Sequence, residues 1–339
     1  MQLSDFDYPL PEDRIAQRPL EDRAASRMLV LYRKEQRWLD RTFRELPQFL
    51  TPGDCLVLND SKVFPSRLYG HRERFSGQVE VFLLRPVSED RLTWQALVHP
   101  GRKMRTGERV HFAKGMTAEV IARGPYGERT VRFECEGELY ERLEAIGHVP
   151  LPPYIRRPDT PEDRWRYQTV FAEQIGSVAA PTAGLHFTPE VLEACREAGA
   201  TLARVTLHVG LGTFQPIHAE NLEQHRLHSE SYSIPEEAAR TMREASRLVA
   251  VGTKAVRTIE TAMQQGGLAR AQGETGLFIY PGFEFKAVGA MLTNFHLPRS
   301  SLLMLVCAFA GADLTLSAYR HAVESGYRFY SYGDCMLIL

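Results

Sequence analysis

The sequence predicts an α/β protein with a mixed sheet, into which a small antiparallel β-barrel is inserted. Strand and helix candidates alternate at both ends of the chain, short strands separated by turns fill the middle, and a Pro-rich stretch closes that middle section. At 339 residues the chain is long for one core and suits about two domains. We predict a discontinuous α/β catalytic domain over residues 1–64 and 156–339, with an inserted β-barrel domain over residues 65–155.

The first sixty residues contain two apolar strand candidates, at residues 28–32 and 55–58, with a helix candidate at 42–49 between them. The second strand candidate runs into Asn59 and Asp60. Because open α/β sheets bind ligands at the carboxyl ends of strands, Asp60 is a candidate site residue. An ordinary Asn-Asp turn is the alternative.

The sequence pattern changes in the middle of the chain. Short alternating segments at residues 79–84, 92–98, 118–121 and 130–133 are separated by turn residues, which is typical of a small antiparallel barrel. A helix candidate at 139–146 and a Pro-rich exit at 149–154 follow, and they predict a stiff domain junction.

The remainder of the chain returns to an α/β pattern of alternating helices and strands. Helices are expected at residues 191–198, 236–248, 254–264, 300–310 and 314–324, and strands at residues 202–208, 249–251, 276–280 and 291–293.

Composition excludes little. The net charge is −1, and of the 41 basic residues 35 are arginine, a side chain suited to phosphates and bases, although codon bias in a GC-rich genome gives the same excess. Residues 61–110 carry ten basic against five acidic side chains, which is compatible with a phosphate-facing surface.

Five scattered cysteines without a CxxC or HExxH motif predict neither disulfides nor a metal site. The start lacks a signal peptide's apolar segment, and the apolar run at 302–310 is too short to span a membrane, so we expect a cytoplasmic protein.

Three loops in the C-terminal half each carry a histidine beside Gly or Pro, at residues 179–188, 207–216 and 293–298. The first loop surrounds His186 with small residues, and Gly184 in particular permits close approach of the backbone to a ligand. We interpret the three loops as walls of one site. Three unrelated loops with partly buried histidines are the alternative.

Further titratable residues lie at positions that are compatible with proton transfer or ligand binding. Alternation over residues 224–232 puts His228, Glu230 and Tyr232 on one face of a strand, where a carboxylate beside an imidazole suits proton transfer; an ordinary surface pair has the same spacing. Asp334 precedes an apolar terminal strand, and it is either a site residue or a turn acid. The turn at residues 251–254 offers helix N-terminal amides to a phosphate or carboxylate.

Ordered motifs run along essentially the whole chain, at residues 6–11, 15–17, 26–28, 58–63, 180–188, 208–214, 228–230, 251–253, 280–282, 292–298, 302–306, 327–329 and 331–334. Through these motifs the chain resembles the S-adenosylmethionine:tRNA ribosyltransferase-isomerases of queuosine biosynthesis. One departure is Lys254, where the family pattern leads us to expect a hydroxyl residue after Gly-Thr.

The resemblance implies an unusual reaction. The ribosyl part of S-adenosylmethionine, a co-substrate, is transferred to 7-aminomethyl-7-deazaguanine at the tRNA wobble position, and rearrangement gives epoxyqueuosine-tRNA, methionine and adenine. The sulfonium acidifies the C5′ hydrogens, so a general base is needed, and the departing adenine benefits from a proton donor. No metal or prosthetic group is expected. The partners are tRNA and S-adenosylmethionine, no membrane is involved, and a monomer is compatible with the sequence.

The resemblance also suggests roles for the candidate residues. We expect His186 and His208 to act as acid and base near the ribose, and Glu230 and Asp334 to hold or orient the substrate amine and sulfonium. The expected substrate-binding residues are Asp60 and Arg67, near the domain junction where tRNA enters, together with Thr182, Gly184, Gly210, Gly212, Thr213, Gly252, Thr253, Asn294 and His296.

Two other functions stay open on the sequence alone. An S-adenosylmethionine-dependent RNA methyltransferase would leave S-adenosylhomocysteine, but the chain lacks an early glycine-rich strand-turn-helix motif. A non-catalytic RNA-binding protein would explain the basic segment, but not three histidine loops in the other domain.

Overall fold

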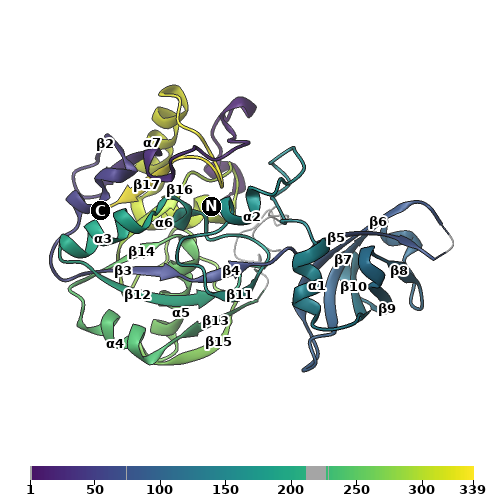
Figure 1. Ribbon diagram of the computed structural model, residues 1–339. Helices are drawn as coiled ribbons and strands as arrows, with labels where there is room; N and C mark the ends of the chain where they lie inside the picture. The colour runs from purple at the N-terminus through teal and green to yellow at the C-terminus, as the bar shows by residue number, and fades with distance from the viewer. Residues whose placement is uncertain (1, 74, 211–226, 228) are drawn as a thin grey trace.

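A nine-stranded mixed sheet forms the centre of the larger part of the chain, and a closed barrel stands beside it (Figure 1). The computed structural model describes residues 2–73, 75–210, 227 and 229–339. The strand order in the sheet is β15-β13-β12-β3-β14-β16-β17-β1-β2. These strands are β1 (Arg27–Tyr32), β2 (Arg37–Thr42), β3 (Asp54–Asn59), β12 (Thr201–Leu207), β13 (Glu230–Ile234), β14 (Arg247–Val251), β15 (Ala271–Thr275), β16 (Val288–Asn294) and β17 (Cys335–Ile338).

Helices cover both faces of this sheet because its central strands are apolar on both sides. Every residue of β3 is buried. The helices are α1 (Leu139–Ile146), α2 (Asp163–Arg166), α3 (Pro189–Glu197), α4 (Glu236–Glu244), α5 (Thr253–Gln264), α6 (Ser301–Ala310) and α7 (Ala312–Glu324). Successive side chains of β1 point to opposite faces, so that Leu29 belongs to the core formed with α4 to α7, and Met28 to the core formed with α3 and the 3-10 helix η4 (Phe43–Phe49).

The barrel closes through antiparallel pairs in the order β10-β7-β6-β5-β8-β9. Alternate side chains fill its interior, with Trp94, Leu83 and Phe133 almost wholly buried. Its strands are β5 (Arg67–Arg72), β6 (Gln78–Pro86), β7 (Thr93–His99), β8 (Arg109–His111), β9 (Thr117–Arg123) and β10 (Glu128–Glu134), and beside it β4 (Ser61–Val63) pairs with β11 (Gln174–Ser177).

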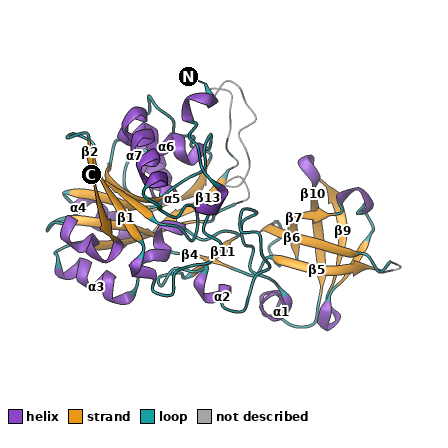
Figure 2. Ribbon diagram, turned by 90° about the horizontal axis from the view of Figure 1, so that it is seen from above, coloured by secondary structure: helices purple, strands orange, loops and turns teal. Residues whose placement is uncertain are grey.

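The predicted fold class is therefore confirmed: a mixed α/β sheet and an antiparallel barrel that lies between two of its segments in sequence. Figure 2 shows α1 and α2 where the two parts meet. The exact domain boundaries at 64/65 and 155/156 stay predictions.

Three predicted elements differ from the structure. The helix expected over residues 236–248 ends at Glu244, because β14 from Arg247 onward pairs with β3 and β16. No strand forms over residues 276–280; the neighbouring strand is β15, which ends at Thr275. The helix expected near residues 42–49 is a 3-10 helix with Pro47 inside it, and proline lacks the amide that an α-helix needs.

Among the described residues, no single helix is both long and apolar enough to cross a membrane. The bent pair α6 and α7, which meet at 117°, passes that test together by length and composition only.

Candidate active site

The carboxyl ends of the parallel strands β12, β3, β14 and β16 lie along one edge of the large sheet. The antiparallel strands β13 and β17 begin at the same edge, since Tyr232 pairs with Leu207 and Cys335 with Asn294. The loops that follow or precede these strands therefore converge. A cavity of about 550 Å³ opens among them.

All three histidine loops contribute to the wall of this cavity. Residues 179–183 come from the first loop, Val209 from the second and residues 293–298 from the third. The structure thus brings together three segments that the sequence placed in one site. Gly212, Thr213 and His228 lie outside the described residues.

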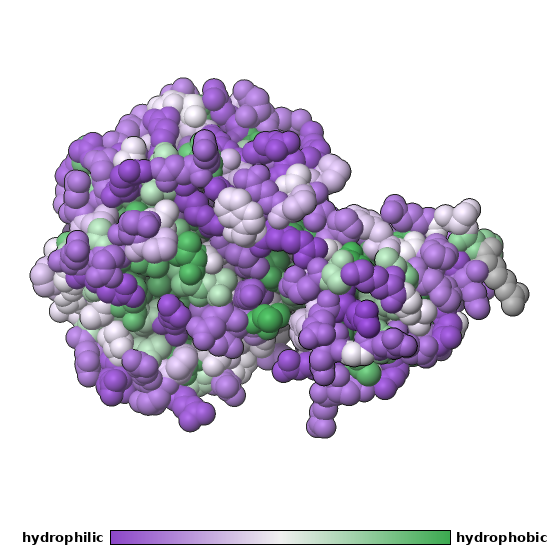
Figure 3. All heavy atoms as spheres, viewed as in Figure 1, coloured by the Kyte–Doolittle hydropathy of each residue, from purple (hydrophilic) through white to green (hydrophobic). Residues whose placement is uncertain are grey.

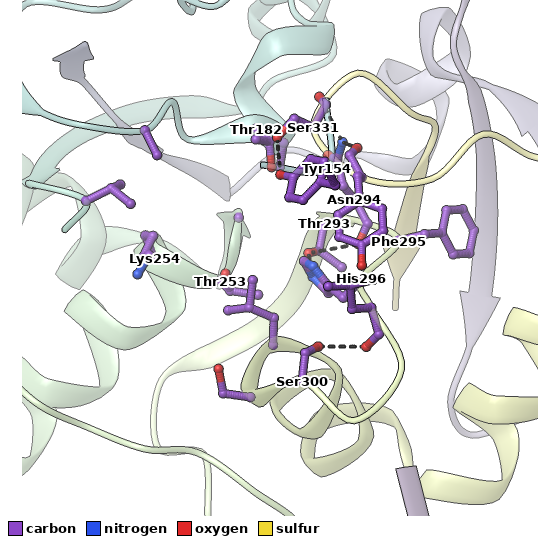
Figure 4. A pocket seen from close by; sticks show the side chains of 18 of the residues that line it. Tyr154, Thr182, Thr253, Lys254, Thr293, Asn294, Phe295, His296, Ser300 and Ser331 are labelled. Carbon is purple, nitrogen blue, oxygen red and sulfur yellow. Dashed lines mark hydrogen bonds between the residues drawn. The ribbon is translucent and has the colours of Figure 1, made fainter. Parts of the chain in front are cut away.

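The third loop presents a buried imidazole at the cavity. His296 Nε2 lies 2.7 Å from Thr293 Oγ1, as Figure 4 shows, and its backbone is held by Tyr8 and Tyr319. Burial lowers the pKa of His296 to about 3, so the ring is neutral at physiological pH. Asn294, beside it, donates a 2.8 Å hydrogen bond from Nδ2 to the carbonyl oxygen of Tyr330.

The start of helix α5 forms another part of the wall. Gly252 precedes the helix with a φ of 90°, a conformation that strains other residues, and Gly252, Thr253 and Lys254 line the cavity. The amides of the first helical turn are not used within the helix and favour anions. The predicted turn at residues 251–254 therefore does lie at a ligand-sized cavity.

Lys254 joins a buried cluster of charges. Its Nζ donates to both carboxylate oxygens of Glu230 at 2.8 Å, Arg257 donates to the same carboxylate, and the amide of Gly210 donates to it at 2.9 Å. Burial raises the pKa of Glu230, but Lys254 and Arg257 outweigh burial and hold that pKa below its usual value. Burial lowers the pKa of Lys254 to about 8, so a positive charge stands at the cavity wall below that pH.

The two histidines that the sequence analysis proposes for catalysis, His186 and His208, do not line the cavity. His186 closes the 3-10 helix η8 (Thr182–His186), where Nδ1 lies 2.9 Å from Ser26 Oγ and Nε2 lies 3.1 Å from Asn294 Oδ1. Burial lowers the pKa of His186 to about 4. It therefore reaches the cavity only through Asn294. His208 directly follows β12, its ring lies against Gly176, and burial lowers its pKa.

The two candidate aspartates hold backbone and hydroxyl groups. Asp334 accepts hydrogen bonds from the amides of Arg27 at 2.9 Å and Arg328 at 2.7 Å, and Asp60 accepts one from Thr206 Oγ1 at 2.7 Å. Burial raises the pKa of both carboxyls. Neither residue lines the cavity, so these contacts favour a structural function for each.

Two more candidates lie away from the cavity wall. A Cβ atom at Gly184 would lie 2.7 Å from Phe171 Cζ, so packing against Phe171 requires a glycine here. Arg67 begins β5 in the barrel, where its backbone pairs with His148 and its Nε lies 3.2 Å from Glu80. Their predicted binding roles stay predictions. Thr182 lines the cavity, and its binding role stays a prediction as well.

Aromatic side chains form a wall that the sequence reasoning missed. Tyr154, Tyr167 and Tyr330 line the cavity, and the rings of Tyr154 and Tyr330 are 4.2 Å apart between centroids. Tyr154 Oη lies 2.7 Å from Ser331 Oγ (Figure 4). The signals that could have revealed it are a tyrosine at the end of the Pro-rich junction and another in the turn before the last strand. Such a wall suits a flat ring.

Comparison with known proteins gives this cavity a context. The profile of one family, described as queuosine biosynthesis protein, matches residues 3–338. The chain belongs to this family. It is 64% identical, over the full length of both chains, to the S-adenosylmethionine:tRNA ribosyltransferase-isomerase of Solibacter usitatus, and 51% identical, again over both full lengths, to that of Symbiobacterium thermophilum.

A solved structure agrees with this family membership. The crystal structure of S-adenosylmethionine tRNA ribosyltransferase from Thermotoga maritima is 42% identical and superposes with a TM-score of 0.57, covering 99% of this chain and 100% of that one.

Proposed function

We propose that this chain is an S-adenosylmethionine:tRNA ribosyltransferase-isomerase. It transfers and isomerises the ribosyl part of S-adenosylmethionine onto 7-aminomethyl-7-deazaguanine at the tRNA wobble position, giving epoxyqueuosine-tRNA, methionine and adenine. The observation that carries this proposal is the identity of 64% over its full length to a relative of that name. The enzyme would work in the cytoplasm as a monomer and without a prosthetic group.

The cavity has the properties that S-adenosylmethionine requires. Its volume of about 550 Å³ falls within the range of about 300–1,000 Å³ usual for small-molecule sites. We assign the adenine to the wall formed by Tyr154 and Tyr330, because aromatic faces stack on a flat ring. We assign the methionine carboxylate to the start of α5 with Lys254, where helix amides and an ammonium both favour an anion.

Proton transfer is assigned to His296 in place of His186 and His208. Among the described residues, His296 is the histidine that lines the cavity, and this position is what supports it as the group that accepts a proton from the C5′ carbon next to the sulfonium. His186 then has a positioning role, since it holds the side chain of Asn294 from behind.

The barrel is assigned to tRNA. Arg102, Lys103 and Arg105 are exposed on one loop that follows β7, and among the described residues no ion pair involves them. A loop with three free cations suits a phosphate backbone. With the tRNA backbone bound to the barrel in this way, the wobble nucleotide would reach the cavity across the domain junction.

One experiment tests the assignment. The purified protein is mixed with S-adenosylmethionine and tRNA carrying 7-aminomethyl-7-deazaguanine, and the products are analysed by mass spectrometry. Methionine and adenine, together with a matching mass gain on the tRNA, are expected. S-adenosylhomocysteine would instead make the protein a methyltransferase.

A further inference from the structure

One tryptophan stands on the surface at the domain junction. Trp94 is fully buried in the barrel and Trp38 is half-buried, but Trp165 is 56% exposed, the highest value among the large apolar side chains of the described residues. Val170 and Ile175, a few residues further on, are 42% and 48% exposed. Figure 3 shows apolar side chains at the surface where the barrel meets the larger part.

The backbone beneath Trp165 is firmly held. Arg23 Nη2 donates to the carbonyl oxygen of Trp165 at 2.6 Å. On the preceding residues, Arg164 Nη2 donates to the carbonyl oxygen of Gly147 at 2.6 Å, and the buried carboxylate of Asp163 accepts from Arg157 at 2.6 and 2.8 Å. An exposed ring on a fixed backbone loses little conformational freedom when a ligand covers it.

The position of Trp165 connects the barrel with the cavity. It belongs to α2, which Figures 1 and 2 show between the large sheet and the barrel helix α1. Tyr167, two residues later, lines the cavity. The guanidinium of Arg166 lies 5.2 Å from the centre of the Trp165 ring, but it is buried and donates to the carbonyl oxygens of Leu20 and Glu21. The exposed aromatic face of Trp165 is therefore the feature on which an unstacked base can stack.

A wobble base that enters the cavity must leave the stack of the anticodon loop. Its neighbour in the loop then loses a stacking partner. We propose that the Trp165 ring stacks on a nucleobase next to the reacting nucleotide and so replaces the partner that extrusion removes. This inference rests on the proposed function, because it takes tRNA as the substrate.

The test compares Trp165→Leu with Trp165→Phe in the full-length protein. At saturating S-adenosylmethionine, Trp165→Leu should raise the KM for 7-aminomethyl-7-deazaguanine tRNA about 10-fold, within the range of about 5- to 150-fold expected for the removal of one base stack. Its kcat at saturating tRNA and its KM for S-adenosylmethionine should stay near the wild-type values. Trp165→Phe should keep most of the tRNA affinity because it keeps an aromatic face.

Fluorescence gives a second readout that does not depend on turnover. An anticodon stem-loop should quench the tryptophan emission of the wild type, and Trp165→Phe should lose that quenching. Val87→Ala, which removes an apolar side chain 50% exposed on the barrel, serves as the control and should behave as the wild type. Equal KM values for Trp165→Leu and the wild type, or unchanged quenching in Trp165→Phe, would overturn the inference.

Two other outcomes are equally clear. Trp165→Leu that matches Trp165→Phe in its KM for tRNA would show that an aromatic face is not required and would overturn the stacking proposal. A wild-type protein that releases no methionine and adenine from the tRNA substrate would refute the proposed function itself.

Discussion

The barrel interior and the carboxyl edge of the large sheet bury side chains of opposite chemical character. The barrel interior buries apolar side chains such as Trp94 and Phe133 in one core. The carboxyl edge of the large sheet buries the polar and charged side chains of Glu230, Lys254 and His296. Burying polar and charged groups is costly, so a fold does so where their chemistry is needed. The comparison assigns chemistry to the sheet edge and leaves the barrel to bind through its surface.

The largest expected effect comes from the buried charge cluster. Glu230→Ala leaves Lys254 and Arg257 buried without their carboxylate, and should lower the free energy of unfolding by about 3–5 kcal/mol, with loss of activity. Glu108→Ala, which breaks the Arg72–Glu108 pair of the barrel, should cost about 1 kcal/mol. Denaturant unfolding measures both values. Equal costs would remove the distinction between the two regions.

The next effect separates the histidines. His296→Gln should lower kcat about 100-fold or more and leave the KM for tRNA unchanged, because proton transfer at the cavity is lost. His186→Gln should lower kcat less, since His186 acts through Asn294. Steady-state kinetics at a temperature well below each variant's Tm measure both. A larger loss of kcat in His186→Gln would return the catalytic role to His186.

The pH dependence of S-adenosylmethionine binding tests the assignment of the methionine carboxylate to Lys254. Because its folded pKa is lowered to about 8, the ammonium is present below that pH and is lost as the pH rises through it. The KM for S-adenosylmethionine should therefore rise above pH 8, by up to about tenfold per pH unit.

Lys254→Arg provides the control for that rise, because arginine stays charged throughout the range. Its KM for S-adenosylmethionine should stay flat across pH 8. His186 and His296, with pKa values of about 4 and 3, should add no inflection between pH 5 and 7. A rise of equal size in Lys254→Arg would show that another group titrates.

Salt dependence addresses the barrel surface. Tight tRNA binding should weaken steeply with added salt, and replacing Arg102 and Lys103 by alanine should reduce the slope of log affinity against log salt by roughly 0.9 for each phosphate that the protein no longer neutralises. The KM for S-adenosylmethionine should not change. Filter binding at several salt concentrations measures the slope, and an unchanged slope would take this loop out of the tRNA interface.

The smallest effect concerns the aromatic wall. Tyr154→Phe removes the hydroxyl that lies 2.7 Å from Ser331 Oγ and keeps the ring. It should lower the free energy of unfolding by about 1 kcal/mol and change kcat little. A kcat loss as large as that of His296→Gln would mean that the hydroxyl itself takes part in the reaction.

The sheet was predictable because its strands are nearly continuous apolar runs. Residues 55–58 and 28–32 could be recognised locally, and the alternation of the barrel strands was equally clear. The convergence of the three histidine loops also followed, since each adjoins a strand end or lies beside one.

The direction of each side chain within those loops could not be predicted. His186 points to Ser26 and Asn294, which are 160 and 108 residues away in sequence, and only the tertiary fold sets that choice. For the same reason the sequence does not reveal that Gly184 packs on Phe171. Lys254 stood out in sequence, but its bond to Glu230 depends on how α5 and β13 meet.

The place of Tyr154 has a consequence for how such proteins can be recombined. Pro153 and Tyr154 follow the barrel in sequence, yet they form part of the cavity wall. A chimera that exchanges barrels between relatives by cutting at residue 155 would carry a foreign piece of wall into the cavity. The graft that preserves the reaction should join the chains before residue 149, so that the Pro-rich exit travels with the host and not with the transplanted barrel.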